Sequence, residues 1–90
     1  MYCVKVFVRE GCSKSPAARE VALLLKEAGY DVHEYRMETA EGLAECFYHG
    51  IMTTPTLLIV DAEEHHLSSW RGTVPAIRDV INALIGCFAA

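Results

Sequence analysis

The chain has 90 residues, 52 % of them hydrophobic, and its formal net charge is −4 from eight basic and twelve acidic residues. A chain of this length forms one small domain, which buries about 60 % of the surface of its unfolded state. Its scattered lysines and arginines argue against a nucleic-acid surface, which needs a clustered positive field. The longest apolar stretch is far shorter than the ~20 residues of a membrane span, and the amino terminus lacks the pattern of a signal peptide. We therefore expect a cytoplasmic protein with no nucleic-acid or membrane partner.

The first half of the chain predicts a strand, a helix and a second strand. Residues 2–8 place three valines on one face of a strand. Residues 15–28 repeat apolar side chains at helical spacing, and Gly29 follows as a stop signal. Residues 32–37 alternate again as a strand, and a strand–helix–strand unit of this kind makes the two strands parallel through a right-handed crossover.

The middle of the chain predicts a short helix and a hairpin. Thr39 is placed to cap a helix that runs through Tyr48 and ends at Gly50. Residues 56–60 are continuously apolar and therefore predict a central strand. Residues 65–70 predict a fourth strand that pairs with it as an antiparallel hairpin.

The last element is expected to be a helix that Thr73 caps, with Pro75 in its first turn and Gly86 as its stop. The predicted order is β-α-β-α-β-β-α. It corresponds to an α/β fold with a four-stranded mixed sheet, helices on both faces and one domain over residues 1–90.

Four cysteines are present, and no two have the C-x2-C spacing of a metal site. Without a secretion signal, reduced thiols are expected rather than two disulfides. Cys3 and Cys87 lie in apolar segments and are interpreted as small buried hydrophobes. Cys12 differs, because it lies between the first strand and the first helix, where helix amides can stabilise a thiolate.

The histidines do not form a metal-binding pattern. His65 and His66 are adjacent in an expected strand, so their side chains point to opposite faces. We interpret them, together with His33 and His49, as solvated or partly buried side chains and expect no metal.

Three segments resemble the thioredoxin superfamily in its compact, glutaredoxin-like form. They are the strand–loop–helix around Cys12-Ser13-Lys14-Ser15, the Thr-Pro step within residues 50–60, and the glycine turn of residues 70–73. All three occur in the order typical of the family, and the resemblance covers nearly the whole chain. It implies a thioredoxin-like fold, whereas function depends on the site rather than on the fold.

The resemblance implies a role for each matching residue. Cys12 would be the nucleophilic thiol, Pro55 the cis-proline that faces it, and the backbone of Thr54 the edge that pairs with an extended substrate. A hydroxyl from Ser13 or Ser15 could donate a hydrogen bond to the thiolate. The candidate catalytic residues are Cys12, Ser15 and Pro55, and the candidate substrate-binding residues are Arg9, Lys14, Thr53, Thr54, Gly72 and Thr73.

The chain departs from dithiol thioredoxins at three positions. Ser15 stands where the resolving cysteine would complete C-x-x-C, which makes the motif a monothiol C-x-x-S. Val6 stands where thioredoxins carry a buried carboxylate, and Gly11 replaces the tryptophan before the nucleophile. A two-cysteine cycle is therefore not expected unless Cys3 or Cys46 comes within disulfide distance of Cys12.

The chain also matches glutaredoxins only in part. Arg9 matches the basic residue that precedes the glutaredoxin cysteine, but the turn Arg71-Gly72-Thr73 lacks the acidic partner of a glutathione site. Glutathione binding is therefore possible but not indicated by the sequence. No cofactor is expected, and binding of an iron–sulfur cluster is disfavoured.

The start of the first helix remains open between two alternatives. The resemblance places it at Cys12, whereas Ser15-Pro16 is itself a good helix-starting pair. A start at Ser15 leaves Cys12 in the loop with less help from the helix amides.

The sequence favours a monothiol thiol–disulfide oxidoreductase for cell redox homeostasis, in which Cys12 forms mixed disulfides with protein or glutathione disulfides. The alternative is a non-catalytic thioredoxin-fold module that binds peptides or proteins at the cis-proline edge. A third hypothesis is a dimer linked through an edge strand or through Cys46 or Cys87. Whether the chain is an enzyme stays open at this level.

Overall fold

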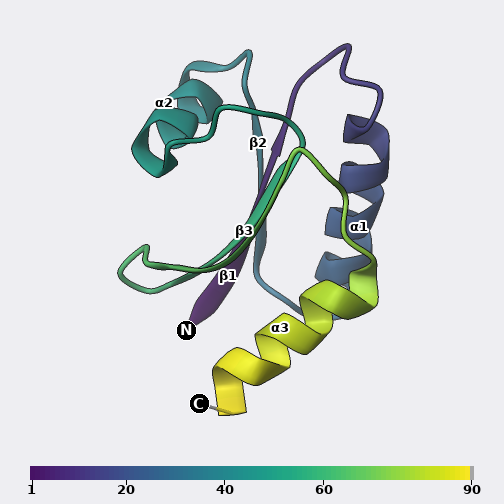
Figure 1. Ribbon diagram of the computed structural model, residues 1–90, viewed down its shortest axis with the longest axis vertical. Helices are drawn as coiled ribbons and strands as arrows, with labels where there is room; N and C mark the ends of the chain where they lie inside the picture. The colour runs from purple at the N-terminus through teal and green to yellow at the C-terminus, as the bar shows by residue number, and fades with distance from the viewer. Residues whose placement is uncertain (90) are drawn as a thin grey trace.

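The structure, a computed structural model, describes residues 1–89 and confirms the predicted order of elements. The elements, coloured in chain order in Figure 1, are β1 (Tyr2–Val8), α1 (Ser15–Glu27), β2 (Val32–Arg36), α2 (Ala40–His49), β3 (Thr56–Asp61), β4 (His66–Arg71) and α3 (Ile77–Ala89). The sequence-based boundaries of the four strands agree with these to within one residue. In the described part of the chain, none of the helices is long and apolar enough to cross a membrane.

The strands form one mixed sheet in the order β2-β1-β3-β4, as expected for an α/β fold. β1 pairs with β2 in parallel, and the β1–β3 and β3–β4 pairs are antiparallel. In the β1–β3 pair, Phe7 lies opposite Thr56 and Cys3 lies opposite Val60. The carboxyl end of β1 therefore lies beside the start of β3. This places the loop after β1 and the loop before β3 at the same end of the sheet.

Helices cover the two faces unequally. α1 and α3 lie together on one face and α2 lies alone on the other (Figure 1). The larger core, between the sheet and the α1–α3 layer, takes Val4, Val6 and Val8 from β1. The smaller core, under α2, takes Phe7 together with Cys46 and other residues. The alternation of β1 explains both, because neighbouring side chains of a strand point to opposite faces.

β3 is central, as its continuous apolar run predicts. Leu57, Leu58, Ile59 and Val60 are all 0 % exposed. Each such side chain contributes about 1.5–3 kcal/mol when it is removed from water, so β3 anchors both cores and holds the loop before it in place.

The caps of α2 agree with the sequence. Thr39 Oγ1 accepts a hydrogen bond from the Gly42 N–H at 2.9 Å. Gly50 ends the helix with a φ of 66°, a conformation that glycine adopts without strain. The chain that leaves this cap leads directly to Thr54 and Pro55.

Expectations for the last helix were wrong at both ends. α3 begins at Ile77, so Thr73 does not cap it and Pro75 lies before its first turn. The Gly72 N–H bonds the Pro55 carbonyl at 2.8 Å, which keeps the preceding turn on the sheet. Gly86 does not stop the helix, because it lies in helical conformation and only a left-handed glycine ends a helix in this way. A glycine inside a helix is unfavourable by about 1 kcal/mol relative to alanine but is not forbidden.

Candidate functional site

Cys12 lies in a tight turn between β1 and α1. The Cys12 N–H bonds the Arg9 carbonyl at 3.2 Å, and the Ser15 N–H bonds the Cys12 carbonyl at 3.1 Å. α1 begins at Ser15, with Lys14 as an N-cap whose side chain makes no capping bond. Of the two alternatives for the helix start, the structure has the later one, and Cys12 is in the loop.

The Thr54-Pro55 step faces this turn from the start of β3. The sulfur of Cys12 lies 3.6 Å from the Thr54 carbonyl oxygen, to which its thiol donates. The peptide bond between Thr54 and Pro55 is cis. Two segments that lie more than 40 residues apart in the chain therefore meet around one sulfur atom.

The surroundings of Cys12 favour its thiolate. A hydrogen bond from the Ser15 hydroxyl, followed by one from the Lys14 backbone N–H, lowers the pKa of Cys12 to about 7. Desolvation opposes this effect, and weaker hydrogen bonds from Thr54 and the Ser15 backbone support it. Although Cys12 precedes the helix, the amides at the helix start still reach its sulfur. A thiol with this pKa is about half ionised at pH 7, and the thiolate is the species that attacks disulfides.

Ser15 itself is held firmly. Its side chain is buried, with the residue 5 % exposed, and its Oγ accepts the Arg9 N–H at 3.2 Å. The Ser15 hydroxyl proton therefore remains available for a hydrogen bond to the sulfur of Cys12. Arg9 thus acts through its backbone, and its side chain is exposed.

The glycine turn of residues 70–73 lies beside Lys14 and Thr53. Lys14 Nζ donates to the Gly72 carbonyl at 3.4 Å. Gly72 has a φ of 73°, and a Cβ at this position would lie 3.6 Å from Thr53 Oγ1. Lys14, Thr53 and Gly72 therefore surround the Cys12–Thr54 pair, whereas Thr73 is exposed beyond the turn.

Cys3 and Cys46, the two cysteines considered as resolving thiols, lie in other parts of the fold. Cys3 lies opposite Val60, four residues along β3 from the end where Cys12 lies, which corresponds to about 13 Å at 3.3 Å per residue. Cys46 is 3 % exposed in the core under α2. Burial raises the pKa of both thiols, so neither is placed or activated to resolve a disulfide at Cys12.

The position of the buried thioredoxin carboxylate is apolar here. Val6 is 0 % exposed and packs in the larger core. The groups that stabilise the Cys12 thiolate are thus chiefly the hydroxyl and amides of its own turn, and of the two hydroxyls expected from the sequence it is that of Ser15 that contributes.

A partly buried group of polar side chains, which the sequence did not reveal, lies under α2 around the buried Lys5 and His49. Lys5 Nζ lies 2.6 Å from Glu45 Oε1, 2.5 Å from Glu64 Oε1 and 3.1 Å from His49 Nε2. His49 Nδ1 in turn lies 2.8 Å from His66 Nε2. We call these five residues the Lys5 cluster. Burial alone would lower the pKa of Lys5, but the hydrogen bonds to the two glutamates outweigh it and raise the pKa above its usual value.

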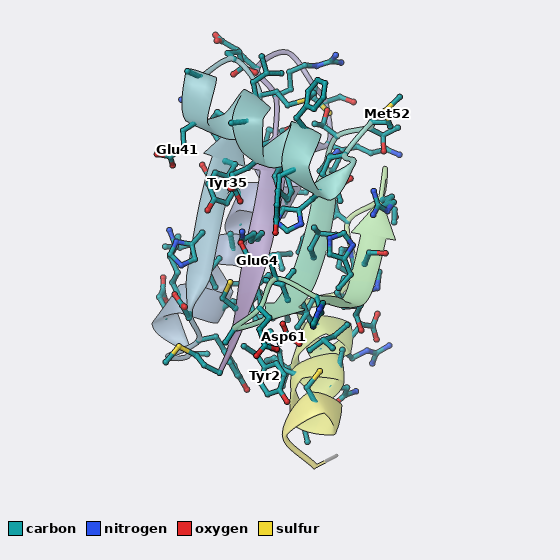
Figure 2. The ribbon with its side chains drawn as sticks, turned by 90° about the vertical axis from the view of Figure 1, so that its left-hand side faces the viewer. Tyr2, Tyr35, Glu41, Met52, Asp61 and Glu64 are labelled. Atoms are coloured by element: carbon teal, nitrogen blue, oxygen red, sulfur yellow. The ribbon has the colours of Figure 1, made fainter. Side chains whose placement is uncertain are left out.

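An apolar pocket of about 350 Å³ is lined in part by Met52, which precedes Thr54 by two residues. It lies between α2 and the chain that leads to Thr53, and Phe47 and Met52 on its rim are each 88 % exposed. Figure 2 shows Met52 projecting at the end of the molecule that α2 covers. The remaining lining residues are Met37, Leu43, Cys46, Gly50 and Ile51.

No protein-family model matches the sequence, and no curated protein matches it. Solved structures are similar over nearly the whole chain. Thioredoxin 1 from Thermosipho africanus TCF52B has a TM-score of 0.75 at 19 % identity, covering 97 % of this chain and 94 % of that one. Thioredoxin O2 from Arabidopsis thaliana has a TM-score of 0.71 at 15 % identity, with 96 % and 74 % covered. A thioredoxin-fold protein from Helicobacter pylori has a TM-score of 0.71 at 15 % identity, with 96 % and 69 % covered.

These likenesses establish the class to which the chain belongs by its fold. The chain has a thioredoxin-like fold, which confirms the resemblance read from its three motifs. At such identities the comparison carries the fold alone, and the chemistry has to be argued from Cys12 and its neighbours.

Proposed function

We propose that this chain is a monothiol thiol–disulfide oxidoreductase with Cys12 as its nucleophile. The observation that supports this most is the single thiol of lowered pKa beside the Thr54 carbonyl. Ser15 hydrogen-bonds the thiolate in the position where dithiol relatives of the fold carry a second sulfur. The site can therefore form a mixed disulfide but has no internal group to release it.

The reaction at Cys12 has two exchange steps. The Cys12 thiolate attacks one sulfur of a disulfide, the S–S bond breaks, and the second sulfur leaves as a thiolate that takes a proton from water. The thiolate of a low-molecular-weight thiol of the glutathione class then attacks the substrate sulfur of the mixed disulfide, a new S–S bond joins these two molecules, and Cys12 leaves as its thiolate. A second molecule of the external thiol attacks this new disulfide and releases the substrate thiol. Over the full cycle, one disulfide is reduced to two thiols, and two molecules of the external thiol are oxidised to one disulfide.

The Thr54 backbone gives this chemistry a binding edge. An extended peptide can pair with it as an added strand, with its sulfur directed at Cys12. Lys14 and the turn at Gly72 flank that edge, and Thr53 lines it. Thiol- or disulfide-containing proteins and glutathione disulfides are the partners, in a reducing compartment such as the cytoplasm. A solved thioredoxin f2 of the same fold is seen in complex with a ferredoxin:thioredoxin reductase, a precedent for a protein partner.

Reduction of a glutathione–peptide mixed disulfide tests the proposal. With excess glutathione as the reductant, the unaltered chain should accelerate the reaction and Cys12→Ser should not. Cys87→Ser is the matched control and should keep the activity. Equal rates for the unaltered chain and Cys12→Ser would reject the proposal.

A second candidate function is a peptide-binding module without turnover. The apolar pocket lined by Phe47 and Met52 favours it, because contiguous exposed apolar surface commonly marks a binding site. In this case Cys12→Ser would keep the affinity for an extended apolar peptide, while Met52→Asp would remove it. The oxidoreductase would form an adduct at Cys12 and catalyse disulfide reduction, whereas the binding module would do neither.

A further inference from the structure

The end of the sheet opposite Cys12 carries a second group of side chains with sulfur, oxygen and nitrogen atoms close together. Cys3 is the second residue of β1, Asp31 directly precedes β2, and His33 is the second residue of β2. We call these three residues the Cys3 cluster. In Figure 2, α2 crosses the upper end of the sheet face that is turned toward the viewer, and it does not reach the lower end of that face near Asp61, where α3 lies behind the sheet.

The pairing of β1 with β2 puts the three side chains on one face. The Val4 N–H bonds the Asp31 carbonyl at 2.9 Å, and Lys5 lies opposite His33. Residues two apart in an extended segment share a face. Cys3 and His33 therefore belong to the face that α2 covers in part, where Cys3 packs beside the smaller core.

The ligand atoms of the cluster converge. A sulfur, a carboxylate oxygen and an imidazole nitrogen all lie within 4.8 Å of one another. Asp31 Oδ1 and His33 Nε2 are 3.1 Å apart. Two ligands of a tetrahedral zinc ion at about 2.0–2.1 Å are about 3.3 Å apart, so this pair already has the separation of two metal ligands.

We propose that Cys3, Asp31 and His33 bind a divalent transition-metal ion of the zinc type at the amino-terminal end of β1 and β2. Thiolate, imidazole and carboxylate are the donors that Zn²⁺ takes in proteins. The thiol of Cys3 loses its proton to solvent when the ion binds. The Asp31 and His33 side chains are 50 % and 51 % exposed, so both are free to move the remaining distance toward the ion.

A pocket of about 160 Å³ leaves room for the fourth ligand. Cys3 and Asp31 line it, together with Asp61 and Glu64. Asp61 Oδ1 already accepts two backbone N–H groups at 2.9 Å, and Glu64 is held by Lys5. The fourth position is thus left to water or to a small ligand, in an acidic pocket that favours a cation.

A neighbouring cluster shows why the ion belongs at Cys3. Glu45, His49 and Glu64 also converge within 4.8 Å, but the Lys5 ammonium lies within hydrogen-bonding distance of all three. That ammonium takes the place of a metal cation. It is held there by two short ion pairs of 2.6 Å and 2.5 Å.

The test is a Co²⁺ titration of the Cys12→Ser chain in a phosphine reductant, because the thiolate of Cys12 would otherwise compete for the metal. We expect one Co²⁺ per chain, a sulfur-to-cobalt charge-transfer band in the near ultraviolet, and its loss when Zn²⁺ is added. In this background Cys3→Ser should abolish the band, and His33→Ala and Asp31→Asn should each weaken binding at least about tenfold. His65→Ala, which removes a histidine whose side chain is 72 % exposed against 51 % for His33, should leave it unchanged.

Zn²⁺ should also raise the melting temperature of the Cys12→Ser chain and not that of the Cys3→Ser double variant. Circular dichroism without metal checks that each variant folds, and His33→Ala supplies a second ligand variant at a half-exposed position. The absence of a charge-transfer band overturns the proposal. So does a band that persists without Cys3, or a loss of binding in His65→Ala that equals the loss in His33→Ala.

Discussion

The hydroxyl group of Ser15 forms a hydrogen bond to the sulfur of Cys12 and is the largest cause of the lowered pKa of that thiol. The residue that replaces a second cysteine is therefore not a passive substitute. It removes the internal route for release of a mixed disulfide, and at the same time it stabilises the thiolate that forms one. Both consequences lead to measurable expectations.

The reactivity of Cys12 should follow a titration near neutrality. With a pKa of about 7, half of Cys12 is thiolate at pH 7, compared with about 3 % of an ordinary cysteine of pKa ~8.5. The thiolate is the form above the pKa, so the rate of alkylation by iodoacetamide should rise with pH, reach half of its maximum near pH 7 and level off by about pH 8. Cys12→Ser serves as the control and should remove this phase. A midpoint at the ordinary value would contradict the stabilisation of the thiolate.

Ser15→Ala should raise the pKa of Cys12, because the largest stabilising hydrogen bond of the thiolate is lost. The same alkylation profile should move toward higher pH, with a lower rate at pH 7. Ser13→Ala is the matched control, since Ser13 is exposed and is not among the groups that lower the pKa. Equal shifts in both variants would mean that the turn, rather than the Ser15 hydroxyl, sets the pKa.

Ser15→Cys should restore a dithiol site. The new sulfur would lie where the hydroxyl now contacts Cys12, so an internal disulfide should form on mild oxidation and mixed disulfides should be released without an external thiol. Counting free thiols after oxidation measures this directly. If the variant still accumulates a mixed disulfide to the same level as the unaltered chain, the missing second sulfur is not what makes the site monothiol.

Lys5→Met should destabilise the fold by about 2–3 kcal/mol. The substitution removes the cation and leaves the two carboxylates of Glu45 and Glu64 close together beside His49. Removal of one partner of a buried ion pair is costly. The expected loss is no larger than about 2–3 kcal/mol because both carboxylates are partly exposed to solvent. Urea unfolding at pH 7 gives the free energy of unfolding. Lys26→Met, at an exposed position of α1, should change it by less than about 0.5 kcal/mol.

The sequence predicted the parts of the site that depend on local patterns. Cys12 before a helix and Thr54-Pro55 before an apolar strand are both local signals, and the order of the strands brings their two loops together. The start of α1 could not be decided, because Ser15-Pro16 and Cys12 offer competing signals over three residues. The structure has the later start, yet the amides still reach the sulfur.

Other features arise only from the tertiary arrangement. Lys5 occurs in an apolar strand, and its partner Glu64 lies 59 residues further along the chain, so no spacing rule connects them. The members of the Cys3 cluster are also far apart in sequence, because only the parallel pairing of β1 and β2 brings Asp31 and His33 beside Cys3. The start of α3 was misplaced because Thr73 and Pro75 are typical start signals, while the hydrogen bond between Gly72 and Pro55 holds that segment on the sheet.

The most direct measurement is mass spectrometry of the protein after reaction with a peptide disulfide at pH 7, followed by peptide mapping. We predict a single mixed disulfide at Cys12 that persists until an external thiol is added, while Cys3, Cys46 and Cys87 stay unmodified. An adduct spread over the other cysteines, or none at Cys12, would contradict the assignment of Cys12 as the reactive thiol.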